Sequence, residues 1–146
     1  MAILDKSKKP YIVDRDENVF IGIDLPFRKS DGVEGLFAST STTIEAAKVN
    51  LKCLLNTKKG ERIFQPSLGL DLQKYLFEQI TTDTELEIQN DISQTVRAWL
   101  PFITIQNISV YIDENQQGHT INVSVTFNIN RDPTSLDTVS VTIGGD

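Results

Sequence analysis

Residues 120–130 read TINVSVTFNIN, a run in which apolar and polar side chains alternate without a break. A period of two is typical of a β-strand with one face in the core and one face outside it. The expected inward residues are Ile121, Val123, Val125, Phe127 and Ile129. The outward residues are all polar and uncharged: Thr120, Asn122, Ser124, Thr126, Asn128 and Asn130. The outward face is either solvated or packed against another subunit, and for an isolated domain we favour the solvated face.

Two further strands are predicted on either side of this run. Residues 103–112 alternate in two phases, and a β-bulge near Gln106-Asn107 would absorb the slip between them. Residues 116–118 are predicted to form a turn before the strand over 120–130. Asp132-Pro133 is expected to break that strand. A short last strand is predicted over residues 136–143, with inward Val139, Val141 and Ile143. Short polar turns between consecutive strands favour an antiparallel meander.

Three helices are predicted before the meander. Thr42 and Glu45 have the spacing of a capping box at the start of the first helix, which runs to about Asn56. A short second helix is expected over residues 70–79, with Leu72, Tyr75 and Leu76 inward. The third is expected to begin at a second capping box, Thr82 and Glu85, and to end before Pro101. Its apolar face would comprise Ile88, Ile92, Val96 and Trp99.

The region before the helices is less regular. Residues 1–18 are predicted to be an extended arm, and residues 20–25 a short strand. Residues 27–40 are expected to be a loop, held to the core by Leu36 and Phe37. The fold class is therefore α+β, with three helices packed on a small antiparallel C-terminal sheet meander and a short N-terminal strand. The predicted division is an arm over 1–18 and a single domain over 19–146.

Composition narrows the classes of function. The chain has 146 residues, a formal net charge of −6 and 39% hydrophobic residues, which fits one soluble domain. The acidic balance argues against a nucleic-acid partner and against an anionic membrane surface. No signal peptide or transmembrane segment is expected. The single cysteine, Cys53, lies in an apolar helical stretch and is interpreted as a buried, inert thiol.

Residues that could carry catalysis are sparse. The one histidine, His119, follows a predicted turn, and no Cys/His cluster has metal-ligand spacing. Glu61 is the only acid inside the apolar connector of residues 61–69, and pairing with Arg62 would lower its pKa, which is wrong for a general acid. We therefore expect no catalytic residue, no metal and no cofactor. Pro66 and Gly69 lie three residues apart in this connector, close to the apolar Phe64 and Leu68. This pattern predicts that the connector is ordered.

One stretch resembles a known family. Residues 54–62 read LLNTKKGER, followed by Pro66, Gly69 and Leu76-Phe77-Glu78. This pattern is similar to the baseplate wedge, or sheath-initiator, subunits of contractile phage tails, with relatives in type VI secretion and other contractile injection systems. The resemblance covers residues 41–143. It implies a structural subunit that is not an enzyme, located in the virion tail baseplate and assembled in the host cytoplasm.

The family usually carries Glu-Pro-Arg after its third helix, a motif thought to grip the helical core of the wedge complex. The matching residues here are Leu100-Pro101-Phe102, so the proline is kept and both charges are replaced by apolar side chains. Either this segment makes an apolar contact with a partner that has changed too, or Leu100 and Phe102 fill the protein's own core.

The resemblance implies assembly as the mechanism. The expected partners are other baseplate wedge proteins and the tail sheath subunit, with tail tube or hub proteins as further candidates. The last strand would accept a sheath strand at its edge through backbone hydrogen bonds and so template the first sheath ring, and the N-terminal arm would order along a neighbouring wedge protein. The alternatives are a peptidoglycan hydrolase, which is lysozyme-like, and a regulatory protein-binding module. The expected partner-binding residues are Gly60, Glu61, Arg62, Pro66, Leu100, Pro101, Phe102, Val139, Val141 and Ile143.

Overall fold

The computed structural model describes residues 20–30, 36–77, 81–113, 120–130 and 132–144. The arm expected over residues 1–18, the turn expected at 116–118 and His119 lie outside these residues. The chain forms two compact units, Met1–Ala46 and Ala47–Asp146. The division into an arm and a single domain over 19–146 stays a prediction. No helix in the described ranges is long and apolar enough to cross a membrane.

The N-terminal unit contains a two-stranded antiparallel ladder. β1 (Gly22–Ile23) pairs with β2 (Ser39–Thr40), and the Asp24 amide donates to the Ala38 carbonyl at 2.9 Å. The strand predicted over 20–25 is therefore present but only two residues long. β2 was not predicted, because a two-residue strand has no detectable period and acquires its hydrogen bonds only from its partner.

The prediction that Leu36 and Phe37 hold the loop over residues 27–40 to the core is wrong. Leu36 is 70% exposed and Phe37 is 48% exposed. The Phe37 ring instead packs on Phe27, with ring centroids 5.3 Å apart. Both rings belong to the loop expected over residues 27–40. Lys29 and Phe37 of the same loop also form an isolated antiparallel β-bridge.

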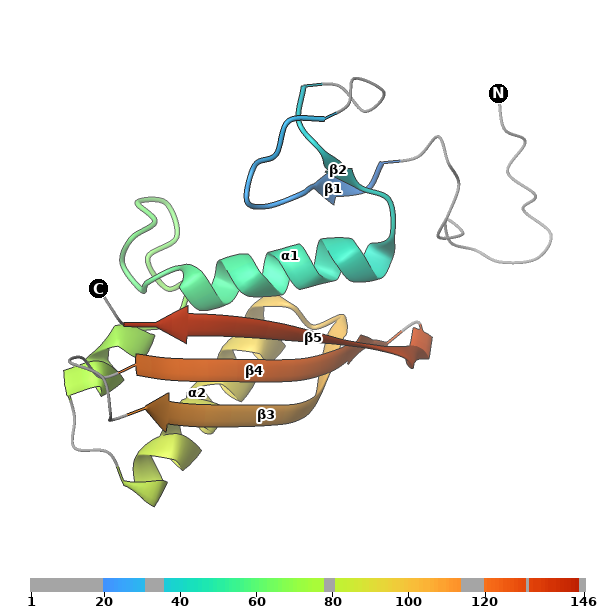
Figure 1. The fold of residues 1–146 in the computed structure, drawn as a ribbon. Coiled ribbons are helices and arrows are strands. Elements are labelled where there is room, and N and C mark those ends of the chain that lie inside the picture. The colour runs from blue at the N-terminus through green and yellow to red at the C-terminus, as the bar shows by residue number, and fades with distance from the viewer. Residues whose placement is uncertain (1–19, 31–35, 78–80, 114–119, 131, 145–146) are drawn as a thin grey trace, which may run out of the picture. The chain divides into compact units, whose positions relative to one another are not determined.

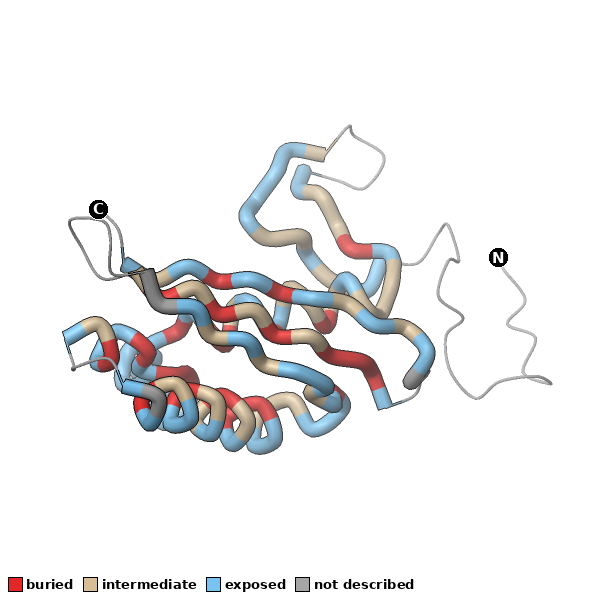
Figure 2. Tube along the Cα trace, turned by 60° about the horizontal axis from the view of Figure 1, so that its bottom comes forward, coloured by how far each residue is buried: buried red, intermediate tan, exposed pale blue. Residues whose placement is uncertain are grey.

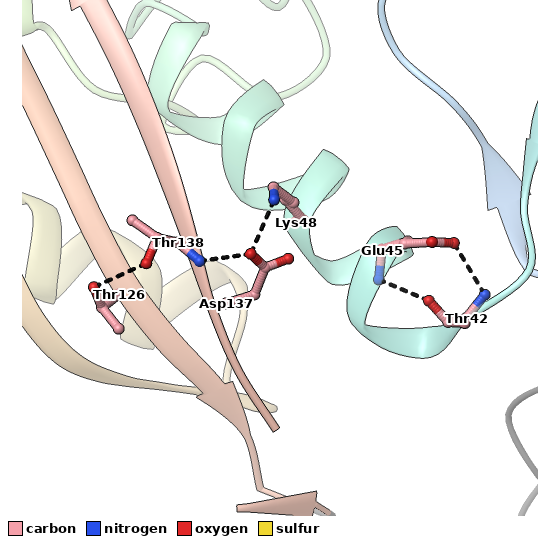
Figure 3. Close-up of polar contacts among 6 residues, drawn as sticks. All are labelled: Thr42, Glu45, Lys48, Thr126, Asp137 and Thr138. Atoms are coloured by element: carbon pink, nitrogen blue, oxygen red, sulfur yellow. Dashed lines mark hydrogen bonds and ion pairs between the residues drawn. The ribbon is translucent and has the colours of Figure 1, made fainter. Parts of the chain in front are cut away.

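Helix α1 (Thr43–Asn56) begins as predicted. The Glu45 amide donates to the Thr42 hydroxyl at 3.3 Å, and the Thr42 amide donates to the Glu45 carboxylate at 3.4 Å (Figure 3). The two bonds satisfy amides that a helix start leaves without intrahelical partners. The buried residues of α1 recur at helical intervals, and they are Ala47, Leu51, Leu54 and Leu55.

The second helix is a 3₁₀ helix and is shorter than predicted. η1 spans Leu72–Phe77, with Leu72 and Tyr75 buried as expected and Leu76 half-buried. Residues 78–80, where the predicted helix would have ended, lie outside the described residues. A 3₁₀ helix suits a segment this short, since its tighter turn is stable only over a few residues.

Helix α2 (Thr82–Trp99) carries its capping box one residue earlier than predicted. The N-cap is Thr81, whose hydroxyl accepts from the Thr84 amide, while the Thr84 hydroxyl accepts from the Thr81 amide. Three of the predicted apolar residues, Ile88, Ile92 and Val96, are fully buried, and Trp99 is half-buried. The helix ends at Trp99, and its C-cap is Leu100, directly before Pro101, as the proline predicted.

The C-terminal sheet is the predicted antiparallel meander, in the order β3-β4-β5. β3 is Ile103–Asp113, β4 is Thr120–Ile129 and β5 is Asp132–Ile143. The register of β3 against β4 shifts between Ile105 and Asn107, which confirms the predicted bulge. The predicted inward residues of β4 are all buried.

The last strand is longer than predicted. β4 ends at Ile129, before Asp132-Pro133, as predicted. Pairing of β4 with β5 begins at Ile129 and Asp132, however, so these two residues already belong to the last strand. Proline removes one backbone donor, and it is tolerated near the start of an edge strand because that donor can face away from the sheet. β5 therefore spans 12 residues, not the short segment expected over 136–143.

In the C-terminal unit the helices cover the inward face of this sheet. α1 runs alongside β5 and α2 lies behind the strands (Figure 1). Along β4 half-buried and buried residues alternate from Thr120 to Phe127, and the last three residues of the strand, including the polar Asn128, are all buried (Figure 2). The ammonium of Lys48 on α1 lies 2.9 Å from the carboxylate of Asp137 on β5 (Figure 3). Asp137 shares its face with Val139 and Val141, so α1 packs on the side that carries the core.

Candidate partner-binding surfaces

The connector between α1 and η1 is an ordered loop closed at its base. The Leu70 amide donates to the Thr57 carbonyl at 2.8 Å, and the Thr57 hydroxyl donates to the Cys53 carbonyl at 2.7 Å. Gly69 makes the closure possible. Its φ is +107°, and a Cβ there would lie 2.2 Å from the Thr57 carbonyl oxygen. Only glycine fits this approach, which explains its place in the sequence.

Three of the predicted partner-binding residues shape this loop from within. The Gly60 amide donates to the Pro66 carbonyl at 2.8 Å, and Gly60 has a φ of +88°. The Glu61 carboxylate accepts from the Lys58 amide at 3.1 Å. Glu61 is therefore held in a local turn and faces a backbone donor, so its position has a structural explanation that requires no general acid.

The tip of the connector is a turn that exposes two large apolar side chains. The Gln65 amide donates to the Arg62 carbonyl at 3.2 Å, which places Ile63 and Phe64 at the two central positions. Ile63 is 90% exposed and Phe64 is 98% exposed. The connector is ordered as predicted, and backbone hydrogen bonds close it. No periodicity in the connector marks either residue as a surface feature, so neither was among the predicted partner-binding residues.

The segment after α2 forms a hydrogen-bonded corner. The Ile103 backbone amide donates to the Leu100 carbonyl at 3.0 Å. Asn130 donates twice, from its backbone amide to the Phe102 carbonyl and from its side-chain amide to the Pro101 carbonyl. Leu100 is half-buried and Pro101 is exposed. Phe102 is 41% exposed, so it is not part of the buried core.

The last strand presents its backbone, not its apolar side chains, at the edge of the sheet. Val139 is 2% exposed and Val141 is 5% exposed, while Ile143 is half-buried. The first two side chains are thus committed to the protein's own core. The Thr138 amide donates to the Asp137 carboxylate at 2.7 Å (Figure 3). This bond indicates that Thr138 directs its N–H away from β4.

The outward face of the sheet is linked by cross-strand side-chain bonds. The hydroxyls of Thr126 and Thr138 lie 3.2 Å apart, and the Thr142 hydroxyl donates to the Asn122 side chain at 2.7 Å. Such pairs stabilise neighbouring strands. These bonds give the Thr and Asn side chains involved a role within the sheet, and packing of this face against another subunit stays a hypothesis.

The predicted partner-binding residues lie in the connector, at the end of β5 and at the corner after α2, and the first two of these regions are neighbours. A pocket of about 180 Å³ at the end of β5 is lined by Ile143 together with Lys58 and Leu70 from the base of the connector. Pro101 lines a different groove of about 520 Å³, between α2 and β3. The structure therefore brings the connector and the end of β5 together but leaves the corner at 100–102 elsewhere. In the described residues no group of His, Cys, Asp and Glu could hold a metal ion.

A small polar network joins η1 to α2. The Asp91 carboxylate accepts from the Tyr75 hydroxyl at 2.7 Å and from the Lys74 ammonium at 3.2 Å. Burial raises the pKa of the Asp91 carboxyl, but the bonds from Tyr75 and Lys74 outweigh it and hold that pKa below its ordinary value. Burial, followed by the bond to Asp91, raises the pKa of Tyr75. The network therefore ties η1 to α2 through one carboxylate.

A sequence model of the family described as Baseplate wedge protein gp25 matches residues 41–134, well over half of the chain. The baseplate wedge protein gp25 of Enterobacteria phage T4 is 27% identical over 103 residues, which cover 70% of this chain and 76% of that protein.

Two solved structures share the fold. A Geobacter sulfurreducens protein named as a candidate tail lysozyme superposes with a TM-score of 0.62 at 20% identity, covering 71% of this chain and 92% of that one. A chain of the anti-feeding prophage baseplate superposes with a TM-score of 0.56 at 22% identity, covering 82% of this chain and 81% of that one.

Proposed function

This chain belongs to the Baseplate wedge protein gp25 family, and we propose that it acts by binding other baseplate wedge proteins and by templating the first ring of sheath subunits. The single observation that carries the proposal is the family match over residues 41–134, which includes α1, the connector, α2 and most of the sheet. In this role the protein is a non-enzymatic part of the tail baseplate, assembled in the host cytoplasm.

The side-chain geometry supports a structural role for the connector. Gly60, Glu61 and Pro66 serve the internal hydrogen bonds of the loop, and Arg62 supplies the carbonyl that closes the turn at its tip. A hydrolase would require two carboxylates facing a groove, one of them with a raised pKa. Glu61 is bonded to a backbone amide instead, so the hydrolase alternative gains no support from it.

The sheath contact is proposed for residues 139–143 of β5. Asp137 and Thr138 are engaged by the ion pair to Lys48 and by their own hydrogen bond. Beyond them the strand continues at the sheet edge to Ile143. Edge strands bind a partner strand through backbone hydrogen bonds. Since Thr138 directs its N–H away from β4, the alternation of the strand gives Ser140 and Thr142 the same direction.

The contact with wedge proteins is proposed for the corner at Leu100-Pro101-Phe102. Phe102 and Pro101 are exposed there, and the corner is held by three hydrogen bonds that fix its shape. The contact would be apolar, because this chain has Leu100 and Phe102 where the family usually has charged residues. Tail tube or hub proteins are further candidate partners, as is a neighbour along which the N-terminal arm would order.

The sheath contact can be tested with a proline at position 140. Removing β5 altogether would also remove Val139 and Val141 from the core, so a truncation would not separate binding from folding. Ser140→Pro deletes one outward N–H and spares the pairing to β4. Ser140→Ala is the matched control, because it changes the side chain and keeps the backbone donor.

Each variant would be co-expressed with the sheath and wedge proteins of the same genome and analysed by size-exclusion chromatography. We expect Ser140→Pro to lose co-elution with sheath while it keeps co-elution with wedge proteins, and Ser140→Ala to keep both. Retention of sheath by Ser140→Pro would contradict strand addition at β5. Failure of the wild-type chain to associate with either would contradict the baseplate role itself.

A further inference from the structure

The connector tip carries apolar residues that neither the fold nor the turn requires. Ile63 and Phe64 occupy the central positions of the turn closed by Arg62 and Gln65. Such positions usually hold Gly, Pro, Asn, Asp or Ser, each of which favours the turn conformation or bonds to it. Two large apolar residues have no such local advantage. Their exposures of 90% and 98% also mean that they contribute almost nothing to the core.

The loop that carries this pair is held rigidly. Its base is closed by the bond from Leu70 to Thr57, its middle by the bond from Gly60 to Pro66, and its tip by the bond from Gln65 to Arg62. The Glu61 carboxylate also accepts from the Lys58 amide. Leu70 is only 2% exposed, so the base is anchored in the core. A preorganised loop loses little conformational entropy on binding. The pair is thus presented in one fixed place.

The charge around the pair is opposite to that of the whole protein. Lys58, Lys59 and Arg62 are exposed in residues 57–70, where Glu61 is the one acid and its carboxylate accepts from the Lys58 amide. Asp71 follows at the base of the loop, and Lys59 interacts with the Asp91 carboxylate, so Lys58 and Arg62 supply the positive charge nearest the tip. The chain as a whole has a net charge of −6. A basic tip on an acidic protein favours a binding surface with acidic side chains at its rim.

We propose that Ile63 and Phe64 form an apolar knob that inserts into an acid-rimmed apolar pocket of a neighbouring baseplate protein. The inference rests on the proposed function and adds a contact distinct from the β5 edge and from the corner at 100–102. An aromatic anchor in a pocket, surrounded by charges that guide encounter, is the usual make-up of a strong interface. Gly60, Glu61, Pro66 and Gly69 act indirectly, by positioning the knob.

The affinity test uses Phe64→Ala, with Phe77→Ala as the matched control. Phe77 is 89% exposed and lies in η1, outside the loop. Full-length variants would be titrated against the purified complex of the other wedge proteins encoded with this chain. We expect Phe64→Ala to raise the Kd at least about 30-fold and Phe77→Ala to leave it within about twofold. Equal effects of the two changes, or none from Phe64→Ala, would overturn the proposal.

The charge and the site of burial are tested separately. The double variant Lys58→Ser/Arg62→Ser should slow association with the wedge complex several-fold at low salt and much less at high salt.

The Phe64→Trp variant reports whether position 64 is covered. Subtracting the wild-type spectrum gives the fluorescence of the new tryptophan. That emission should be typical of solvated indole in the free chain and should shift to the blue on binding. Blue emission in the free chain would mean that the protein covers the knob itself, and would overturn the proposal.

A membrane target is the remaining competitor. Vesicles of phosphatidylcholine with added phosphatidylserine should not change the Phe64→Trp emission, and a shift there would overturn the proposal. If wedge proteins bind the wild type and Phe64→Ala equally well, the baseplate role stands and only the knob fails. If they do not bind the wild type, both fail.

Discussion

Replacing Gly69 by alanine should loosen the whole connector. At a φ of +107° an alanine is strained by about 1–2 kcal/mol. Its Cβ would lie 2.2 Å from the Thr57 carbonyl oxygen, which forces the two backbones apart. The hydrogen bond from Leu70 to Thr57 is then lost, at about 1 kcal/mol. Together the changes should lower the free energy of unfolding by about 2–3 kcal/mol.

Gly60→Ala is the matched control for this experiment. Gly60 has a similar φ of +88°, but a Cβ there would meet nothing within 4 Å. Its expected effect is the conformational strain alone, about 1–2 kcal/mol. Urea unfolding followed by far-UV circular dichroism and by Trp99 fluorescence would give both values. If Gly69→Ala were no more destabilising than Gly60→Ala, the steric closure at Thr57 would not be what holds the loop.

Phe127→Ala should lower the free energy of unfolding by about 3–5 kcal/mol in urea, because Phe127 is fully buried; a loss below about 1 kcal/mol would contradict its place in the core. Thr81→Ala should cost about 1 kcal/mol and Thr82→Ala clearly less, since Thr81 is the N-cap; the reverse order would restore the cap predicted from sequence. Asp91→Asn should cost about 1 kcal/mol at pH 7. The pKa of Asp91 is depressed by folding, so this difference should be present above its unfolded pKa and vanish as pH falls through its folded pKa. A difference that persisted in acid would exclude the charge as its cause.

Local patterns were sufficient to predict most of the elements. The alternation over 120–130 required a strand, because a period of two places all the apolar side chains on one face. The phase slip at Gln106 predicted the bulge for the same reason. The cap at Thr42 was also local, since its two bonds join residues three apart. Family membership followed from motifs in the connector, whose glycines and proline the structure explains.

Other features depended on contacts between distant residues. The choice of Thr81 over Thr82 is not among them, because the cap is made by bonds between Thr81 and Thr84, three residues apart. The start of β5 at Asp132 depends on pairing with Ile129 across the sheet. The two residues of β2 become a strand only by bonding to β1.

The proposed partner-binding residues divide in the same way, into those set by local pattern and those set by tertiary contacts. The sequence by itself determined that the connector is ordered and that Val139 and Val141 point inward, because glycine, proline and strand alternation act locally. The tertiary structure decided that Ile63 and Phe64 face solvent. Their direction is set by the closure of Leu70 on Thr57 and by the anchoring of that closure in the core, and no periodicity within the connector encodes either contact.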